Sequence, residues 1–463
     1  MKVCVIGTGY VGLVTGVCLG EIGHNVICVD NDEKKIKMLK NSIMPIYEPG
    51  LENLVKKNTQ SGNLSFTTQI GNAILSQDII FICVGTPPLP DGSADLRFVE
   101  EVAKEIGRNL NSYKIIINKS TVPIGSGDWV SMIINDSVAT GNGIDNGANH
   151  SGNKNAAAIF DVVSNPEFLR EGTAIYDTFF PDRIVLGSAS QKAIDLMIKL
   201  YEKVINRRFE QIDSLPDSKG TKNIPLVKTD LVSAEMIKYA ANSFLATKIS
   251  YINEIANICE KAGADILKVA KGIGLDSRIG ARFLNAGIGW GGSCFPKDVS
   301  ALTKIAAEYG ITTQLLNSAI NVNNQQRLKM VQKAQETLKI IKGKTIGVLG
   351  ISFKPNTDDT RDAPAITIMN NLANLGAKVK AYDPIVKESP ESLNQKVILC
   401  FDTEEIFSGS DLIILATEWE EFIGLDYEKL GALMRDKNFI DGRNFLSKEK
   451  MQSLGFKYSG IGI

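Results

Sequence analysis

The stretch Val3-Cys4-Val5-Ile6-Gly7-Thr8-Gly9-Tyr10-Val11-Gly12 joins an apolar run directly to a glycine-rich turn. The run predicts a buried strand at residues 3–6, and the apolar spacing from Leu13 to Ile22 predicts a helix after the turn. A second predicted strand, Asn25 to Val29, ends in Asp30. A strand, a helix and another strand in this order predict an open parallel sheet covered by helices.

The turn matches the pattern G-x-G-x-x-G, and Asp30 follows its last glycine by 18 residues. This pattern is weak alone, but between a strand and a helix it is typical of dinucleotide binding. Gly7, Gly9 and Gly12 would admit a pyrophosphate to the helix N-terminus, where free N–H groups favour an anion. Asp30 would accept hydrogen bonds from ribose hydroxyls and repel a 2′-phosphate, which favours NAD over NADP. The alternative is a glycine turn without a ligand.

Two more apolar runs, Asp78 to Val84 and Lys114 to Asn118, predict further strands of the same sheet. Thr86 follows the first run and Thr121 follows the second. Ligands of open parallel sheets bind beyond the carboxyl ends of the strands, so we expect both threonines to face the cofactor. Helix capping is the alternative role.

Glu167 and Glu171 follow another predicted strand, at residues 159–163, and are four residues apart. If this segment is helical, the two carboxylates share one face of the helix. Paired carboxylates at a strand end indicate contacts with substrate hydroxyl groups or water. Two solvated glutamates at the start of a helix are the alternative.

The stretch from Gly289 to Asp298 combines three glycines with one cysteine. Glycines let the backbone turn sharply or approach a ligand, and a nearby cation or helix N-terminus stabilises a thiolate. Cys294 is therefore a candidate nucleophile, with Lys297 as the cation. A small buried cysteine is the alternative for Cys294, and capping of a helix at residues 299–309 is the alternative for Asp298.

A helical pattern without proline or interior glycine runs from Thr229 to Gly263. Its length of about 30 residues suits a connector between domains or the seam of a dimer. Lys238 and Asn242 lie four residues apart in this pattern and are expected to face one direction. An ordinary exposed lysine is the alternative for Lys238.

The strand–helix–strand plan begins again in the last third of the chain. Lys344 to Gly350 and Ala377 to Asp383 resemble the first two strands, and Asp411 to Thr417 resembles a third. The turn after Gly350 lacks the second and third glycines of the first turn, so we expect no dinucleotide to bind there in the same way. Cations at the strand ends of this repeat suit a phosphorylated ligand; they are Lys354, Arg361 and Arg443.

The chain has 463 residues and a net charge of -1, which gives no reason to expect a nucleic-acid partner. Seven cysteines, several of them in strand-like runs, predict reduced thiols and no disulfide framework. Neither histidine, His24 or His150, is placed for catalysis.

With no leader-like start and no apolar run of membrane-spanning length, a cytoplasmic protein is expected. Residues 141–158 are rich in Gly, Asn and Ser and predict a solvated surface excursion.

Taken in order, these motifs resemble the UDP-glucose/GDP-mannose dehydrogenase family over nearly the whole chain. The matching segments are residues 7–13, 165–172, 238–242, 291–298 and 350–361. The resemblance implies two Rossmann-like, doubly wound parallel-sheet domains joined by a long central helix, which also forms a homodimer, with the active site between the domains. The implied domains are an NAD-binding domain at 1–215, a central helical and dimerisation domain at 216–328, and a UDP-sugar-binding domain at 329–463.

The resemblance also implies roles for individual residues, and no metal among them. The residues that would contact NAD, besides the glycines of the turn, are Val11, Asp30, Lys35, Thr86, Thr121, Glu171, Lys297 and Arg361. Those that would hold the nucleotide sugar are Phe168, Leu169, Arg170, Glu171, Lys238, Asn242, Phe283, Leu284, Asn285, Ala286, Gly287, Gly291, Lys354 and Arg443, with Arg278 reaching in from the partner subunit. Those that would carry the chemistry are Thr121, Glu167, Lys238, Asn242, Cys294 and Asp298.

The implied activity is the oxidation of UDP-glucose to UDP-glucuronate with two NAD⁺ per substrate. The Cys294 thiolate would add to the intermediate aldehyde, and oxidation of this thiohemiacetal would give a thioester that water hydrolyses. Asp298 and an ordered water would assist proton transfer, while Lys238 and Asn242 would stabilise the oxyanion. Glu167 would position or activate the hydrolytic water. The alternatives are the same chemistry on GDP-mannose or a UDP-N-acetylhexosamine, a two-electron hydroxy-acid dehydrogenase, and a non-catalytic NAD sensor.

Overall fold

The computed structural model describes residues 1–141, 160–212, 215–217 and 222–463. The predicted surface excursion at 141–158 and His150 therefore lie outside the described residues, apart from Gly141 at the end of a helix. The described chain divides into two compact units, Met1–Ala240 and Ala241–Ile463.

The first unit is built on an eight-stranded sheet with the order β3-β2-β1-β4-β5-β6-β7-β8. Neighbouring strands are parallel, except that β6 and β7 are antiparallel. The strands are β1 (Lys2–Ile6), β2 (Asn25–Val29), β3 (Leu64–Thr67), β4 (Ile79–Ile82), β5 (Lys114–Asn118), β6 (Phe160–Ser164), β7 (Ile184–Gly187) and β8 (Leu226–Thr229).

Helices connect these strands. They are α1 (Tyr10–Glu21), α2 (Glu33–Lys40), α3 (Leu51–Gln60), α4 (Ile70–Ser76), α5 (Arg97–Arg108), α6 (Ser126–Gly141), α7 (Ala174–Phe179), α8 (Gln191–Leu200) and α9 (Glu202–Ile205). The apolar run of β1 is buried on both faces of the sheet, because Val3 and Val5 pack into one core and Cys4 and Ile6 into another. A strand covered on both sides by helices needs such a continuous apolar run.

The strand order of this sheet reverses direction between β1 and β4. Chain segments therefore leave the carboxyl ends of these two strands toward opposite sides, and the crevice that results is the usual ligand site of such sheets. The glycine turn follows β1, and Thr86 follows β4. The glycine turn and Thr86, which are part of the predicted cofactor set, thus lie at the reversal point.

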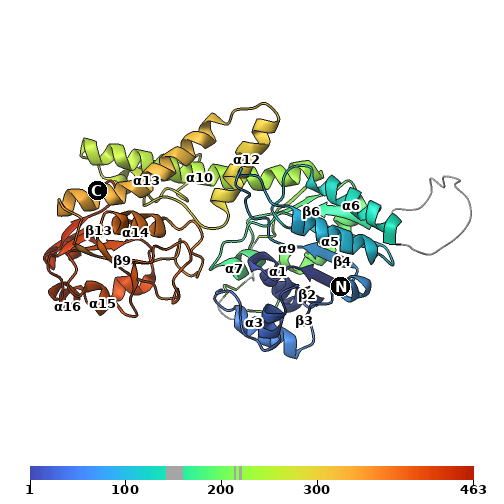
Figure 1. Ribbon diagram of the computed structural model, residues 1–463. Coiled ribbons are helices and arrows are strands. Elements are labelled where there is room, and N and C mark those ends of the chain that lie inside the picture. The colour runs from blue at the N-terminus through green and yellow to red at the C-terminus, as the bar shows by residue number, and fades with distance from the viewer. Residues whose placement is uncertain (142–159, 213–214, 218–221) are drawn as a thin grey trace, which may run out of the picture. The chain divides into compact units, whose positions relative to one another are not determined.

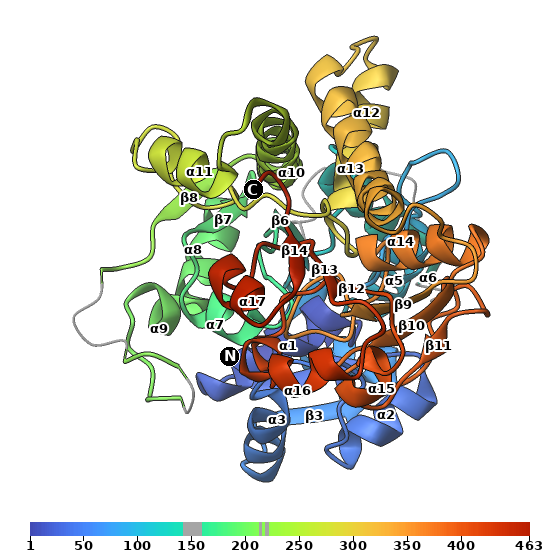
Figure 2. The same ribbon diagram turned by 90° about the vertical axis from the view of Figure 1, so that its left-hand side faces the viewer.

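The second unit contains a parallel six-stranded sheet with the order β11-β10-β9-β12-β13-β14, which can be followed in Figure 2. Its strands are β9 (Thr345–Leu349), β10 (Lys378–Tyr382), β11 (Ile398–Leu399), β12 (Leu412–Leu415), β13 (Asn438–Asp441) and β14 (Lys457–Ser459). Its helices are α11 (Ile266–Gly274), α12 (Phe295–Glu308), α13 (Gln314–Leu338), α14 (Pro364–Asn374), α15 (Thr403–Phe407), the 3-10 helix η1 (Glu420–Gly424), α16 (Tyr427–Ala432) and α17 (Lys448–Ser453).

The predicted internal repeat is confirmed, since both sheets reverse direction in the same way around their first strand. The fold class of two doubly wound, largely parallel sheets with a long helix is confirmed as well. In the second sheet Asp383 directly follows β10, as Asp30 directly follows β2. Its carboxylate accepts hydrogen bonds from the backbone N–H groups of Ile351 and Ser352 and from the Trp419 indole. Asp383 is buried, and the absence of dinucleotide binding in the same way as at the first turn stays a prediction.

The predicted long helix is present as α10 (Leu231–Ala262), a single helix of 32 residues (Figure 1). All seven cysteines are free thiols, as predicted. In the described part of the chain, no helix combines the length and apolar character needed to cross a bilayer.

Candidate active site

The glycines of the first turn serve two different purposes. A Cβ on Gly7, which has φ +101°, would lie 2.6 Å from the Cys83 carbonyl oxygen, and one on Gly12 would lie 1.9 Å from the Gly7 carbonyl oxygen. Both glycines are therefore needed to pack the strand, turn and helix together. A Cβ on Gly9 would meet no protein atom within 4 Å. Its missing side chain leaves open space beside the N-terminus of α1, which is a position that favours an anion.

Asp30 binds this turn through hydrogen bonds. Its carboxylate accepts hydrogen bonds from the Thr8 backbone N–H at 2.9 Å and hydroxyl at 2.6 Å, and from the Lys35 ammonium at 3.3 Å. Burial opposes ionisation, but these donors hold the pKa of Asp30 below its ordinary value. The group is thus an anion near neutral pH. Thr8 was not predicted as part of the site, although its place inside the glycine pattern could have indicated it.

The two threonines predicted beyond β4 and β5 lie together. The Thr86 hydroxyl donates a 2.7 Å hydrogen bond to the Thr121 carbonyl oxygen. Neither threonine caps the next helix, because α5 begins at Arg97 and α6 begins at Ser126. The alternative role of helix capping is therefore wrong, and both residues lie at the carboxyl edge of the sheet.

Glu167 forms a buried ion pair with Lys238 of α10. The Lys238 ammonium lies 2.8 Å from one carboxylate oxygen, and the Leu169 N–H donates a 2.6 Å hydrogen bond to the other. Burial favours the neutral acid, yet Lys238 and these further donors hold the pKa of Glu167 below its ordinary value. Lys238 is 4% exposed, so the alternative of an ordinary exposed lysine is wrong.

The segment that follows Glu167 is not helical. Residues 165–170 have no regular secondary structure, and α7 begins only at Ala174, so the helical spacing assumed for Glu167 and Glu171 does not apply. Within the segment, the Arg183 guanidinium stacks 3.6 Å from the centre of the Phe168 ring. The exposed Arg170 pairs with Asp177.

Tyr10 and Glu48 fix the end of this segment, and neither was predicted. The Gly172 N–H lies 2.7 Å from both the Tyr10 hydroxyl and a Glu48 carboxylate oxygen, and the hydroxyl also bonds to Glu48. Tyr10 lies within the glycine pattern and is the first residue of α1. The predicted cofactor turn and the segment carrying Glu167 to Glu171 are therefore tied together by hydrogen bonds.

In the second unit, Cys294 is the residue directly before α12. It is half-buried, and its sulfur lies 3.5 Å from the Ser293 hydroxyl. Pro296 occupies the first turn of this 14-residue helix, where the missing N–H costs nothing. The structure therefore places Cys294 at the N-terminus of a helix, where free N–H groups and the helix dipole stabilise a thiolate.

Asp298 lies inside the first turn of α12, because the helix begins at Phe295. The predicted start at residue 299, and with it the role of Asp298 as cap, is therefore wrong. Its carboxylate is fully buried, accepts a 2.6 Å hydrogen bond from the Asn242 amide and forms an ion pair with Lys297. Lys297 thus has a carboxylate partner one residue away.

Contacts within the protein explain why glycines are needed before Cys294. Gly289 and Gly292 have φ values of +102° and +84°, which favour glycine. A Cβ on Gly291 would lie 2.2 Å from the Asp362 carbonyl oxygen, so its close neighbour is the chain's own backbone. Arg327 fixes this arrangement by binding both Asp362 carboxylate oxygens and the Trp290 carbonyl oxygen. Arg327 was not predicted, and no local pattern marks it.

Part of the predicted nucleotide-sugar set gathers at the carboxyl ends of β9, β12 and β13. A Cβ on Gly287 would lie 3.4 Å from the Arg443 guanidinium, which itself bonds to the Ala416 and Phe353 carbonyl oxygens. Lys354 follows Phe353, with its ammonium 5.4 Å from that ring. Of the preceding residues, Leu284 and Ala286 are buried, and Phe283 has a φ of 66°.

Two predicted arginines lie at the surface. Arg278 and Arg361 each form a two-pronged ion pair with the aspartate two residues before, Asp276 and Asp359. The predicted residues as a whole fall into two groups. Those from Gly7 to Lys238 belong to the first unit, and those from Asn242 to Arg443 belong to the second.

Comparison with known proteins matches one family along the chain. The models of the UDP-glucose/GDP-mannose dehydrogenase family match with the NAD binding domain at residues 1–205, the central domain at 232–325 and the UDP binding domain at 347–448.

Relatives and solved structures agree with this match. The chain is 48% identical over 462 residues to UDP-glucose 6-dehydrogenase TuaD of Bacillus subtilis (strain 168), covering 100% of this chain and 93% of the relative. It is 43% identical to UDP-glucose 6-dehydrogenase of Rhizobium meliloti (strain 1021), covering 100% and 99%. A UDP-glucose dehydrogenase structure from Pyrobaculum islandicum superposes with a TM-score of 0.85 at 34% identity, covering 100% and 98%. The chain belongs to the UDP-glucose/GDP-mannose dehydrogenase family.

Proposed function

We propose that this chain oxidises UDP-glucose to UDP-glucuronate and uses two NAD⁺ per substrate. The observation that carries the proposal is the half-buried Cys294 at the N-terminus of α12, one turn before the buried Asp298 that Asn242 binds. A dehydrogenase that removes only two electrons has no use for such a thiol. The relatives named UDP-glucose 6-dehydrogenase support the choice of substrate.

The first unit fits NAD. The open side of Gly9 gives the pyrophosphate access to the N-terminus of α1, and the ionised Asp30 suits the ribose hydroxyls. When bound, NAD⁺ accepts one hydride in each oxidation step. We assign further cofactor contacts to Val11, Lys35, Thr86, Thr121, Glu171, Lys297 and Arg361.

The chemistry proceeds through a covalent sulfur intermediate. The first oxidation converts the C6 alcohol to an aldehyde and releases one hydride and one proton. The Cys294 thiolate adds to the aldehyde carbon, and loss of a second hydride from the thiohemiacetal gives a thioester. Water attacks the thioester carbonyl, the carbon–sulfur bond breaks, and the acid and the free thiol are released.

Charged and polar side chains assist these steps. Asp298 accepts protons through a water, and its hydrogen bond with Asn242 holds its carboxylate in place. Lys238 and Asn242 donate hydrogen bonds to the oxyanion of the thiohemiacetal and of the hydrolysis intermediate. Glu167, held ionised by Lys238, positions the hydrolytic water, and Thr121 lies beside the cofactor.

We assign the UDP part of the substrate to the second unit. The Arg443 guanidinium and the Lys354 ammonium supply positive charge at the carboxyl ends of its strands, which suits a pyrophosphate. Further contacts are assigned to Phe168, Leu169, Arg170, Glu171, Phe283, Leu284, Asn285, Ala286, Gly287 and Gly291, with Arg278 donated by a second subunit. Gly291 can contribute only backbone groups, because the space of a side chain is filled by Asp362.

A homodimer through α10 is part of the proposal. Phe244, Tyr251 and Ile258 follow one another at seven-residue spacing and are 65%, 53% and 57% exposed. An apolar stripe of this kind is typical of a helix that packs against a second helix. Light scattering should find a dimer, and Tyr251→Glu should shift it toward the monomer. Phe401→Glu, at an exposed phenylalanine outside α10, should leave the dimer intact.

We also propose a division into functional parts and a location. Residues 1–215 bind NAD, 216–328 form the central and dimerisation part, and 329–463 bind the UDP-sugar. All seven cysteines are free, which is typical of a reducing compartment, and we place the protein in the cytoplasm.

The test is a titration of the purified protein with limiting UDP-glucose and excess NAD⁺, followed by NADH absorbance to completion. Two NADH per UDP-glucose, together with UDP-glucuronate as the product, are expected. One NADH per substrate would indicate a two-electron dehydrogenase. Parallel reactions with GDP-mannose and UDP-N-acetylglucosamine decide the substrate, and no NADH with any of them would contradict an enzymatic role.

A further inference from the structure

Two buried lysines flank strand β5, and they lie at its opposite ends. Lys114 opens the strand and is 1% exposed, while Lys119 directly follows it and is 8% exposed. The Lys114 ammonium donates a 2.6 Å hydrogen bond to the Gln77 carbonyl oxygen, beside the amino end of β4. Lys119 lies at the carboxyl end, where the proposed active-site residues of the first unit gather. Only Lys119 is therefore placed to affect the chemistry.

Lys119 contacts the segment that carries Glu167. Its ammonium donates a 3.3 Å hydrogen bond to the Asn165 side-chain oxygen, which also accepts a 2.8 Å bond from the Tyr201 hydroxyl. The Asn165 amide nitrogen donates to the Val185 carbonyl oxygen at 2.9 Å. Asn165 is thus held from three sides, and it precedes Glu167 by two residues.

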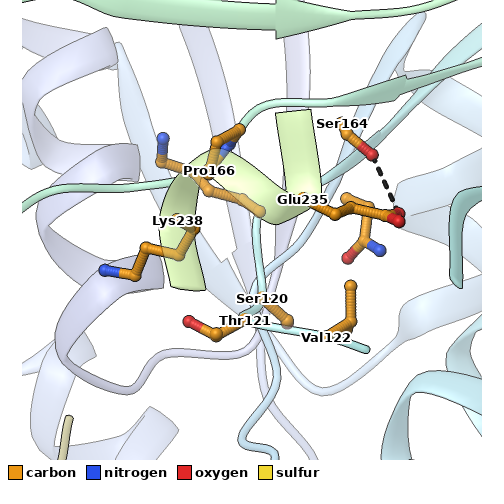
Figure 3. A pocket seen from close by; sticks show the side chains of 9 residues that line it. Ser120, Thr121, Val122, Ser164, Pro166, Glu235 and Lys238 are labelled. Carbon is orange, nitrogen blue, oxygen red and sulfur yellow. Dashed lines mark hydrogen bonds between the residues drawn. The ribbon is translucent and has the colours of Figure 1, made fainter. Parts of the chain in front are cut away.

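Lys119 and Lys238 line the same small cavity, whose volume of about 10 Å³ suits about one water molecule. Thr121 and Glu235 also line it. Figure 3 shows the Glu235 and Lys238 side chains leaving α10 in opposite directions, with Glu235 bonded to Ser164. Lys238 therefore points away from Glu235, and its ammonium pairs with Glu167.

The positive charges of Lys238 and Lys119 both act on Glu167. Burial opposes its ionisation, and the positive charges of Lys238 and, more weakly, Lys119 lower its pKa. Burial lowers the pKa of Lys119, while Glu167 and Cys83 raise it and Lys238 lowers it. Burial raises the pKa of the Cys83 thiol to about 12, so this neighbour is neutral near pH 7.

This arrangement matters because the proposed function gives Lys238 a second task. When the ammonium of Lys238 turns to the oxyanion of the substrate, it shares its charge between that oxygen and Glu167. A buried carboxylate that loses its cation takes up a proton or moves. A second buried cation that stays in place prevents both.

We propose that Lys119 is a positioning residue of the active site, whose buried ammonium keeps Glu167 ionised and in place while Lys238 serves the substrate. The inference rests on the proposed function, in which Glu167 must be ionised to position the hydrolytic water. Lys119 itself contacts neither substrate nor cofactor in this scheme.

The test compares the pH dependence of kcat for UDP-glucose oxidation in Lys119→Met, Lys119→Gln, Lys119→Arg and Lys114→Met. Removal of the positive charge at Lys119 raises the pKa of Glu167. The acid limb of the pH profile of kcat, where the rate falls because Glu167 is protonated, should therefore move to higher pH by about one unit. At the pH of that limb, kcat should fall about tenfold, with KM for NAD⁺ nearly unchanged. Lys119→Arg should keep the wild-type limb. Lys114→Met removes the buried lysine at the other end of the strand and should lower stability without moving the acid limb.

The results of this test distinguish the proposed role of Lys119 from a role in stability alone and from a failure of the proposed function. A folded Lys119→Met or Lys119→Gln protein with the wild-type acid limb overturns the inference, as does an equal shift in Lys114→Met. If neither neutral variant folds while Lys119→Arg does, Lys119 serves stability alone and the inference is wrong. If the wild-type protein forms no NADH from UDP-glucose, the proposed function itself fails, which the titration described above detects independently.

Discussion

The Lys238 ammonium lies 2.8 Å from a carboxylate oxygen of Glu167, and neither side chain exposes more than 5% of its surface. A buried ion pair contributes little net stability when both partners are present, but loss of one partner leaves an uncompensated charge in the protein interior. This pair joins α10 to the segment after β6. Removal of either partner of this ion pair should therefore change the stability of the fold as well as the proposed chemistry.

Lys238→Met should destabilise the protein by about 3 kcal/mol, because Glu167 is left buried without its nearest cation. Chemical denaturation followed by fluorescence measures the change. The double variant Lys238→Met/Glu167→Leu should recover most of the loss. Lys104→Met, which breaks an exposed pair with Glu100, should cost less than about 1 kcal/mol. Equal losses for the two lysine variants would contradict the buried-pair explanation.

Acid should weaken the folded state partly through Glu167. Its folded-state pKa is lowered, so the stability it contributes is present above the ordinary glutamate pKa and is lost as the pH falls through the lowered value. Unfolding free energies measured across acidic pH should therefore decline less steeply in Glu167→Gln than in the wild type. Glu100→Gln, at the exposed ion pair, is the matched control and should leave the slope nearly unchanged.

Cys294→Ser should lower the steady rate of UDP-glucuronate formation by about 10³-fold or more, because a neutral hydroxyl replaces the thiolate nucleophile. Mass spectrometry should detect a slowly hydrolysed ester on the serine. Cys400 is the control, since it is also half-buried but lies where burial raises its pKa to about 11. Cys400→Ser should retain the wild-type rate. Free acid released at the normal rate by Cys294→Ser would rule out the covalent mechanism.

Gly9→Ala and Gly12→Ala should separate cofactor binding from folding. The added methyl group of Gly9→Ala meets no protein atom, so the melting temperature should be unchanged while KM for NAD⁺ rises about tenfold or more, roughly 1.4 kcal/mol of binding. In Gly12→Ala the methyl group collides with the Gly7 backbone, and the melting temperature itself should fall. An unchanged KM in Gly9→Ala would show that no pyrophosphate approaches this turn.

The pattern of the sequence alone predicted the glycine turn, the long helix and the strands β1, β2, β4, β5, β6, β9, β10 and β12, but not the other strands. These features depend on local properties: which residues are apolar, how they are spaced and where a backbone needs glycine. Val3 to Ile6 must be buried on both faces whatever surrounds them, and Gly7 requires its positive φ in any fold that uses this turn. The internal repeat could be predicted because it also depends on the spacing of apolar residues.

Only the tertiary structure decided which charges meet. Glu167 and Lys238 are 71 residues apart, and Asn242 and Asp298 are 56 apart, so no local spacing could pair them. The same holds for Arg327, which holds the glycine segment through Asp362, and for Lys119, which is distinguished from Lys114 by the end of the strand at which it lies. Ion pairs in the interior form where packing brings distant segments into contact, because a buried charge is tolerated only beside its partner. The sequence shows which residue types are available for such pairs, and the packing of the segments selects the partners.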